Sequence, residues 1–256
     1  MIDRFRVAAV QLDLSGSASN IFERIKKYMV LAKKNKVDII CFPEDTFYAG
    51  PKKNKLLIKK IGEECRKNGL SCVLTGHLRE KKHVYNTAII IDSHGNICGK
   101  HKKVRVCDSH NVKAGSDYEI IDTIFCKVGL AICWDISDSY AMNSLAKKGA
   151  RIVFCPLYWC YDEWSHKKHH KKHEKKLLES LALVRAFENL IYIVFCNAYS
   201  KKEKSLVSYS VISGPHMIKK EIFDREGMII GDIDLNYLDY LRRMYKKDYN
   251  TIISKF

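Results

Sequence analysis

Apolar residues recur along the chain in two alternating patterns, which predict a repeated succession of strands and helices. Short continuous apolar runs that end at polar or turn residues are typical of buried strands, and apolar residues three and four positions apart are typical of amphipathic helices. Strands are expected over residues 5–12, 37–42, 71–78, 87–92, 96–103, 128–132, 150–155 and 190–197. Helices are expected over residues 52–68, 137–148, 174–189 and 235–244. A further helix is expected to begin with a capping box formed by Asn20 and Glu23.

The stretch from residue 87 to residue 103 breaks this alternation. Two strand-like runs flank Ser93, His94 and Gly95, which is the signature of a β-hairpin. Strand–helix alternation with an inserted hairpin is typical of a mixed sheet covered by helices. No linker-like change in composition interrupts the chain, so the sequence predicts an α/β protein with a single domain over residues 1–256.

Composition supports a folded protein that does not enter a membrane. Apolar residues make up 46% of the 256 residues, and the chain has only four prolines and thirteen glycines. No apolar run approaches the length needed to cross a bilayer. The first residues lack the apolar segment of a secretion signal and lead directly into an expected strand. We therefore expect a soluble cytoplasmic protein without a membrane partner.

The ten cysteines do not form the pattern of a disulfide framework or a zinc site. No pair has C-x-x-C spacing, and several cysteines lie in or beside apolar runs, where a thiol behaves as a small buried hydrophobe. These are Cys41, Cys126, Cys133, Cys155 and Cys196. The placement predicts reduced thiols in a reducing compartment.

The chain is strongly basic, with 45 lysines and arginines against 29 acidic residues and a formal charge of +16. Such a charge can indicate contact with nucleic acid. The lysines are spread along the whole chain, however, and are not interleaved with aromatic residues. We interpret them as a solvated surface and do not expect nucleic acid as the partner.

Three reactive side chains each lie at the carboxyl end of an expected strand. Glu44 lies in the segment CFPED, Lys103 in GKHKKVRV and Cys133 in GLAICWD. In open α/β sheets, ligands usually bind at the carboxyl ends of the strands. A cysteine nucleophile needs a base for its proton and a positive group where oxyanion charge develops, and these residues supply one group for each role. A following helix and a lysine favour the thiolate of Cys133, whereas a nearby carboxylate opposes it.

Six segments, in order, resemble the signature blocks of the nitrilase superfamily of carbon–nitrogen hydrolases, in its amidase-type branch. They are VAAVQL, FPED, YNTAIIIDSHGNICGKHKKV, GLAICWD, GARIVFCP and RAFENLIYIVFCN. The resemblance extends from Val7 to about Asp234, which is nearly the whole chain. It implies a four-layer α-β-β-α sandwich with two mixed sheets and no metal or organic cofactor.

The resemblance also implies a catalytic triad of Glu44, Lys103 and Cys133. The backbone N–H of Trp134 would bind the oxyanion together with the lysine. Cys133 would attack an amide or N-carbamoyl carbon and form a thioester, and hydrolysis would release an acid and ammonia or an amine. The family habit also implies a homodimer or a higher homo-oligomer. The apolar stripe of Ala141, Leu145 and Ala146 could serve either such a partner or the core.

The chain departs from the family pattern around the triad. His101 and Arg105 replace the aromatic residue and the histidine of the lysine block, and Asp108 stands where many members carry a second glutamate. Residues 136–140 replace a common stretch after the nucleophile. These changes alter the substrate pocket more than the triad. They leave open an alternative function, in which the chain is a catalytically weakened, basic binding protein of the same fold.

Other residues are weaker candidates. Tyr48, Tyr158 and Trp159 could bind substrate, although aromatic residues beside strand ends are commonly core. The segment from Ser165 to Lys176 is rich in histidine and lysine, and three alternatives stay open for it: a metal site, a solvated helix start, or a collar that attracts acidic amide substrates. Glu188 is expected to be structural, through a hydrogen bond or an ion pair with Arg185 or with a backbone group.

Overall fold

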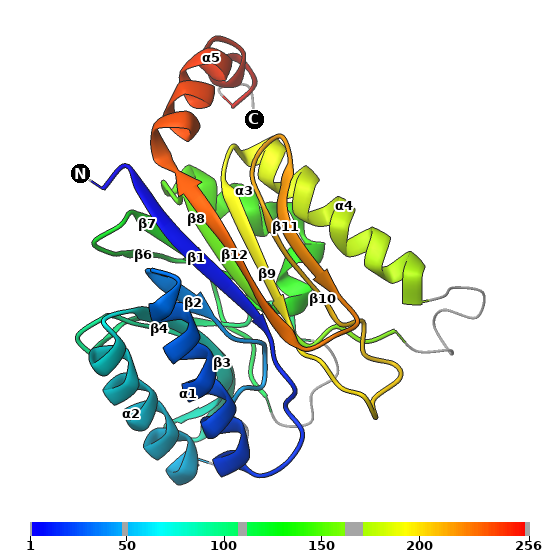
Figure 1. Cartoon of the computed structure of the whole chain (residues 1–256). Coiled ribbons are helices and arrows are strands. Elements are labelled where there is room, and N and C mark those ends of the chain that lie inside the picture. Colours follow the sequence, from blue (N-terminus) through cyan, green and yellow to red (C-terminus); the bar gives the residue numbers. More distant parts are fainter. Residues whose placement is uncertain (1, 48–50, 107–111, 162–170, 254–256) are drawn as a thin grey trace.

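The computed structural model describes residues 2–47, 51–106, 112–161 and 171–253. The chain forms two six-stranded mixed sheets that pack face to face (Figure 1). The first sheet has the order β12-β1-β2-β3-β4-β5 and the second has the order β11-β10-β9-β8-β7-β6. The strands of the first sheet are β1 (Arg4–Gln11), β2 (Ile39–Cys41), β3 (Ser71–Glu80), β4 (His83–Ile91), β5 (Ile97–Lys102) and β12 (Gly227–Asp234). Those of the second are β6 (Ile120–Asp122), β7 (Lys127–Leu130), β8 (Ile152–Leu157), β9 (Tyr192–Asn197), β10 (Tyr209–Ser213) and β11 (Ile218–Phe223).

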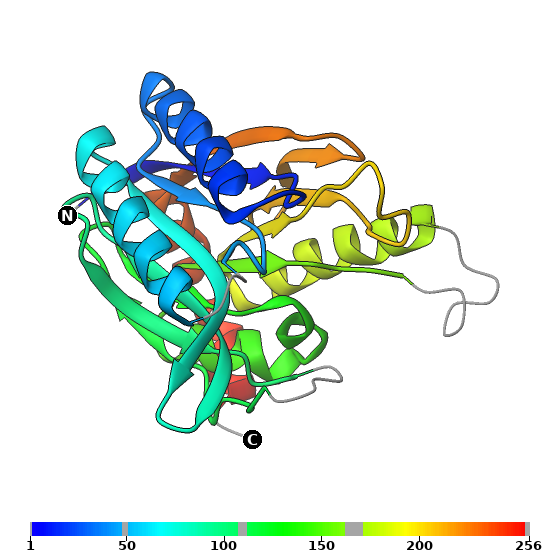
Figure 2. The ribbon, with the colours of Figure 1, turned by 90° about the horizontal axis from the view of Figure 1, so that it is seen from below.

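Helices cover the outer face of each sheet, and this confirms the four-layer α-β-β-α sandwich. On the first sheet lie α1 (Ala18–Lys34) and α2 (Pro51–Asn68), and on the second lie α3 (Ser139–Lys147) and α4 (Lys171–Asn189) (Figure 2). A short 3-10 helix, η1 (Cys133–Ser137), precedes α3, and α5 (Leu235–Ile253) follows β12. None of the helices in the described part of the chain is long and apolar enough to cross a membrane.

Strand β1 shows why the strands read as continuous apolar runs. Val7 and Ala9 face the core between the sheets, whereas Ala8 and Val10 face the core under α1 and α2. Because both faces of the sheet are covered, no position of the strand needs a polar residue. Strands β1, β2 and β3 are mutually parallel, as are β7, β8 and β9, while hairpins supply the antiparallel pairs.

The predicted hairpin is present and carries Lys103 to its position. Strands β4 and β5 pair antiparallel, and the carboxylate of Asp92 accepts hydrogen bonds from the backbone N–H groups of His94 and Asn96 in the turn. Gly95 adopts φ +84°, which side chains disfavour. The turn therefore sets the register of β5, at whose end Lys103 lies.

The predicted start of α1 was wrong. Ser17, and not Asn20, caps the helix: its hydroxyl accepts from the backbone N–H of Asn20 at 3.3 Å, and the Asn20 side chain accepts from the backbone N–H of Ser17 at 3.0 Å. The two side chains therefore satisfy each other's backbone donors, as in a capping box, with asparagine in the position usual for glutamate.

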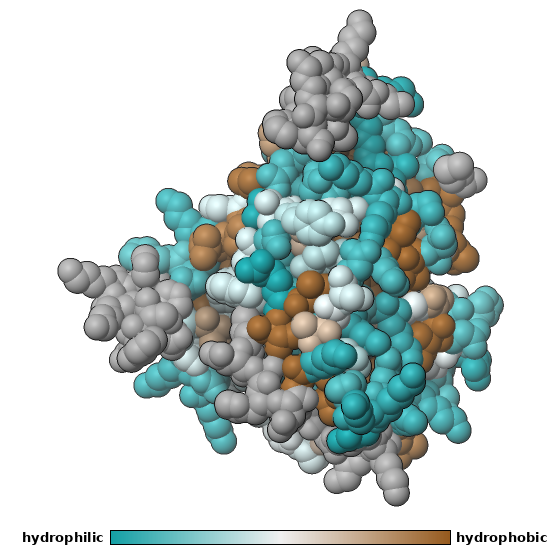
Figure 3. Space-filling model, turned by 180° about the vertical axis from the view of Figure 1, so that it is seen from behind, coloured by the Kyte–Doolittle hydropathy of each residue, from teal (hydrophilic) through white to brown (hydrophobic). Residues whose placement is uncertain are grey.

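Several surface and core expectations are settled by burial. All nine cysteines in the described part of the chain are free thiols, and the five singled out above are buried except for Cys126, which is half-buried. In α3, Ala141 and Leu145 are fully buried, so the apolar stripe belongs to the core. Figure 3 shows polar residues over much of the side opposite to Figure 1, with apolar residues exposed between them.

Candidate active site

The structure brings Glu44 and Lys103 into direct contact. Glu44 follows β2 and Lys103 follows β5. The Nζ atom of Lys103 lies 2.8 Å from Oε1 of Glu44, and the two side chains are only 8% and 5% exposed. An ion pair so well shielded from water interacts much more strongly than a surface pair. Residues 59 positions apart are thus held as one buried acid–base unit.

Further donors fix the Glu44 carboxylate. The Asn86 side-chain amide donates to Oε1 at 2.7 Å, and the backbone N–H of Tyr158, just after β8, donates to Oε2 at 3.0 Å. Sequence reasoning missed the role of Asn86. Its place in the Y-N-T block was the available signal, but the partner lies 42 residues away.

Cys133 lies against this unit in a strained backbone conformation. It is the first residue of η1 and has φ +45°, which is uncommon for any residue except glycine. Burial raises the pKa of the thiol well above its ordinary value, and the charge of Glu44 raises it further, whereas Lys103 lowers it. The charge of Lys103, which favours the thiolate, is therefore outweighed by burial and by the charge of Glu44. The thiol is protonated at neutral pH and needs a base at the moment of attack.

The backbone N–H and the indole ring of Trp134 have different surroundings. Among the described residues, nothing accepts a hydrogen bond from its backbone N–H. The residue as a whole is 41% exposed, and its indole stacks on that of Trp159, with ring centroids 5.1 Å apart. Trp159 is buried and donates through Nε1 to Glu174 at 3.0 Å. The two stacked rings thus form a partly exposed aromatic surface beside Cys133.

Asp135 joins the nucleophile segment to the lysine segment, a role that sequence reasoning missed. Its fully buried carboxylate accepts from the backbone N–H of Ile132 at 2.9 Å, of Val104 at 3.1 Å and of Arg105 at 2.8 Å. His101 Nε2 lies 3.2 Å from the same carboxylate. Ile132 immediately precedes Cys133, and Val104 follows Lys103. Asp135 therefore holds together the two backbones that carry the thiol and the ammonium group.

The replaced family positions have local partners. His101 is buried and stacks on Tyr118, with ring centroids 5.7 Å apart. Arg105 forms an ion pair with Asp138 at 3.0 Å.

Gly115 donates its backbone N–H to the carbonyl of Lys103 at 2.8 Å, and an added Cβ would lie 2.4 Å from the carbonyl oxygen of Lys102. Only glycine fits this close approach to the lysine segment.

A cavity of about 350 Å³ is lined by a second carboxyl group, that of Asp45, the residue that follows Glu44 in the chain. Tyr158 also lines this cavity. Burial, followed by the charge of Glu44, raises the pKa of Asp45 to about 7. Among the described residues, nothing donates a hydrogen bond to its Oδ1 atom. His77 Nε2 lies 3.7 Å away, but burial lowers the pKa of this ring, so it is not a compensating cation at neutral pH.

Replacement of Asp45 by asparagine is expected to stabilise the fold above pH 7. A carboxyl group whose pKa is raised from 3.8 carries an unfavourable charge above pH 7, and protonation relieves this cost as the pH falls from about 7 to about 4. Because 36% of the side chain is exposed, solvent limits the gain to about 1 kcal/mol, or roughly 2–4 °C in Tm. Thermal unfolding at pH 8 and pH 4.5 measures it. A gain that is equal at both pH values would contradict the assignment, and the exposed Asp122→Asn is the control.

Some residues that the sequence suggested for the site lie outside the described part of the chain or form ion pairs elsewhere. Tyr48, Asp108 and residues 162–170 lie outside the described residues. From the histidine- and lysine-rich segment, Lys171 pairs with Asp224 at 2.6 Å, and Lys175 pairs with Glu179 at 2.7 Å and Glu221 at 3.2 Å. Within the described part of the chain, no three His, Cys, Asp or Glu side chains are grouped to hold a metal ion.

Of the structural contacts expected for Glu188, the structure shows the ion pair with Arg185, with a distance of 2.9 Å. Both residues lie in α4, three positions apart. This spacing places them on neighbouring points of the helix surface. Glu188 is therefore a structural residue, and it provides a natural control for substitutions of Glu44.

These features define a cysteine-containing site on a four-layer sandwich, and comparison with known proteins identifies its class. A model of the carbon–nitrogen hydrolase family matches residues 6–243. The chain therefore belongs to the carbon–nitrogen hydrolase family, within the nitrilase superfamily. The resemblance seen in the sequence blocks is confirmed.

Relatives of known class cover most of the chain. An omega-amidase of Xenopus laevis is 25% identical over 268 aligned residues, which cover 93% of this chain and 92% of that protein. A probable nitrilase of Schizosaccharomyces pombe is 31% identical over 175 residues, which cover 65% of this chain and 59% of that protein.

Solved structures share the fold. A carbon–nitrogen hydrolase from Helicobacter pylori has a TM-score of 0.82 at 19% identity, covering 95% of this chain and 94% of that chain. An amidase from Nesterenkonia has a TM-score of 0.77 at 20% identity, covering 96% of each chain. At this level of identity the likeness demonstrates the common architecture.

Proposed function

We propose that this chain hydrolyses a linear C–N bond of a small amide or N-carbamoyl compound through a thioester on Cys133. The observation that carries the proposal is the buried contact of 2.8 Å between Lys103 and Glu44, with the protonated thiol of Cys133 beside it. A neutral thiol, a carboxylate fixed by three donors and an ammonium group are the three components that acyl transfer to cysteine needs.

In the first half of the proposed reaction, the Cys133 sulfur attacks the carbonyl carbon while Glu44 takes the thiol proton. Negative charge develops on the carbonyl oxygen, and the ammonium group of Lys103 and the backbone N–H of Trp134 stabilise it. The C–N bond then breaks as Glu44 returns the proton to nitrogen. Ammonia or an amine leaves, and the acyl group remains on sulfur as a thioester.

In the second half, a water molecule enters the position of the leaving group. Glu44 accepts one proton of this water molecule while the water oxygen attacks the thioester carbon. The C–S bond breaks, the acid leaves and the proton returns from Glu44 to the sulfur. The same carboxyl group thus serves as base and then acid in each half of the reaction, and its three hydrogen bonds hold it in place.

Two findings on related proteins support the proposal. Full-length relatives at 22–25% identity are omega-amidases. A variant of the Nesterenkonia amidase carries the acetamide moiety of fluoroacetamide, added covalently at the active-site cysteine. The buried unit of Glu44, Lys103 and Cys133 supports the same type of chemistry for this chain.

Mass spectrometry of the intact protein with an amide panel tests the proposal. The panel contains short neutral amides, monoamides of dicarboxylic acids and N-carbamoyl amines, each at low and high salt. We expect an acyl adduct on Cys133 and release of the acid with at least one compound, and both are lost in Cys133→Ala. Retention on a polyanion that falls steeply with salt, without adduct or turnover for any compound, would favour the basic binding protein instead.

A further inference from the structure

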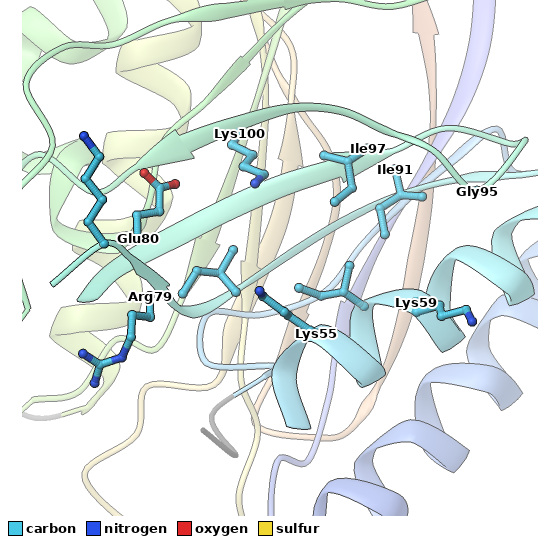
Figure 4. A pocket seen from close by; sticks show the side chains of 11 residues that line it. Lys55, Lys59, Arg79, Glu80, Ile91, Gly95, Ile97 and Lys100 are labelled. Carbon is cyan, nitrogen blue, oxygen red and sulfur yellow. The ribbon is translucent and has the colours of Figure 1, made fainter. Parts of the chain in front are cut away.

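A second and larger cavity, of about 570 Å³, lies on the outer face of the first sheet. Residues of the first turns of α2 form one wall, and β3, β4 and β5 with their hairpin form the other (Figure 4). The volume lies in the range of pockets that bind small organic ligands. None of the residues that line this cavity is one of the groups that contact Glu44, Lys103 or Cys133.

The fold builds this cavity as a wedge between the helix and the hairpin. At one end, α2 and the hairpin turn touch: a Cβ on Gly62 would lie 2.8 Å from the carbonyl oxygen of Gly95. Arg66 Nε donates to the carbonyl of His94 at 2.9 Å and secures the same end. The cavity opens beside residues 55–59, about one to two helical turns earlier in α2. A backbone contact therefore fixes the separation of the walls.

The inner surface of the wedge is apolar. Ile58 and Ile91 are buried, and Leu78 is half-buried. Ile97 lies on β5, the edge strand of the sheet, and is 44% exposed. A ligand with an alkyl chain would remove this apolar surface from water, which favours binding.

The rim of the wedge is cationic and lacks matching acids. Its basic residues are Lys55, Lys59, Arg79, Lys81 and Lys100. Among the described residues, none of the five forms an ion pair. The acidic residue of the lining, Glu80, is neutralised by Lys102 at 2.6 Å.

The lysines do not all point the same way. In Figure 4, Lys55 from α2 and Lys100 from β5 direct their amines toward the space between the two walls. Arg79 and Lys59 point outward along the rim. Two uncompensated ammonium groups thus face one apolar space from opposite walls.

We propose that this cavity binds a free amphipathic anion, an alkyl chain that ends in a carboxylate or a phosphate. The apolar wall accommodates the chain, and Lys55 and Lys100 bind the anionic head between them. A neutral amphiphile would leave both ammonium groups without a partner, and a cationic one would be repelled. The ligand is bound on the same strand, β5, at whose end Lys103 lies, but on a surface separate from the catalytic groups.

Calorimetric titration with three ten-carbon probes tests the proposal: decanoate, decanol and decyltrimethylammonium, each below micelle formation. Decyl phosphate is a fourth probe that tells a phosphate site from a carboxylate site. Because a hydrolase that releases acids can bind decanoate at its catalytic site, the titration is repeated after alkylation of Cys133 with iodoacetamide, in a variant whose exposed thiols Cys98 and Cys160 are replaced by serine and with the modified residue identified by mass spectrometry. We expect saturable binding of one decanoate or decyl phosphate per chain in both forms, and at least tenfold weaker binding of the other two probes.

Substitutions then locate the site. Lys55→Gln with Lys100→Gln is expected to weaken binding of the anion at least tenfold, and Ile97→Gln about threefold. The control pair, Lys27→Gln with Lys220→Gln, removes the same charge from exposed positions away from the cavity and is expected to leave the affinity unchanged.

Three results would overturn the proposal. Decanol that binds as tightly as decanoate would show that the head group is not recognised. Equal losses in both lysine pairs would show an effect of net charge alone. Binding that survives Lys55→Gln with Lys100→Gln but disappears on alkylation would place the acid in the catalytic site. None of these results bears on whether Cys133 forms a thioester, so the proposed hydrolase activity is tested separately.

Discussion

Glu44→Gln is expected to lower kcat by about 10⁴-fold, at the upper end of the range for loss of a general base. The carboxylate acts in both halves of the proposed reaction, and glutamine can neither take the thiol proton nor return it to the leaving nitrogen. Glutamine keeps the size of the side chain, and its carbonyl oxygen can still accept from Tyr158 or Lys103. Steady-state kinetics on the best amide of the panel, with mass spectrometry for the adduct, measure the loss.

The matched control is Glu188→Gln, the same chemical change at a carboxylate that pairs with Arg185 in α4. It is expected to keep kcat within about twofold. If Glu44→Gln kept more than a tenth of the activity, or if both variants lost activity equally, Glu44 would not be the base. The retained fold is checked by thermal unfolding of both variants.

Asp135→Asn is expected to lower kcat by about 100-fold, with a much smaller change in KM. The Asp135 carboxylate accepts hydrogen bonds from both backbones that carry the thiol and the ammonium group, and a displacement of about 1 Å in a reacting group can cost this much in rate. Asparagine presents an NH₂ group to at least one of these donors. A donor that is left buried and unsatisfied costs about 1–3 kcal/mol of stability.

Because Asp135 does not touch the substrate in this proposal, it is a positioning residue, and its test needs a readout beyond stability. Kinetics are measured at a temperature well below the unfolding of the variant, and the rate of Cys133 alkylation is followed alongside. The control is Asp138→Asn, which also contacts Arg105 but lies partly exposed at the start of α3, where asparagine caps a helix as well as aspartate does. Loss of stability without loss of kcat would assign Asp135 to folding alone.

Most of the secondary structure could be predicted from local patterns. The apolar run at 5–12 covers all of β1 except its first residue, the run at 190–197 contains β9, and the turn at Ser93–Gly95 joins the predicted hairpin strands. These patterns predict the elements correctly because a strand covered on both faces is apolar throughout, and a turn with φ above zero favours glycine. The exact start of α1 could not be predicted in the same way, because Asn20 can serve as the cap residue itself or, as it does here, as the partner of the cap residue Ser17, and only the bonded geometry decides between the two roles.

The sequence by itself determined which residues are chemically able to act: a glutamate, a lysine and a cysteine, each at the carboxyl end of an expected strand. Their contact, the third donor from Asn86, the bridging role of Asp135 and the raised pKa of the Cys133 thiol were decided only by the tertiary structure. The physical reason is the same in each case. Hydrogen bonds and desolvation depend on distances between segments that lie tens of residues apart, and no local pattern of apolar and polar positions encodes those distances.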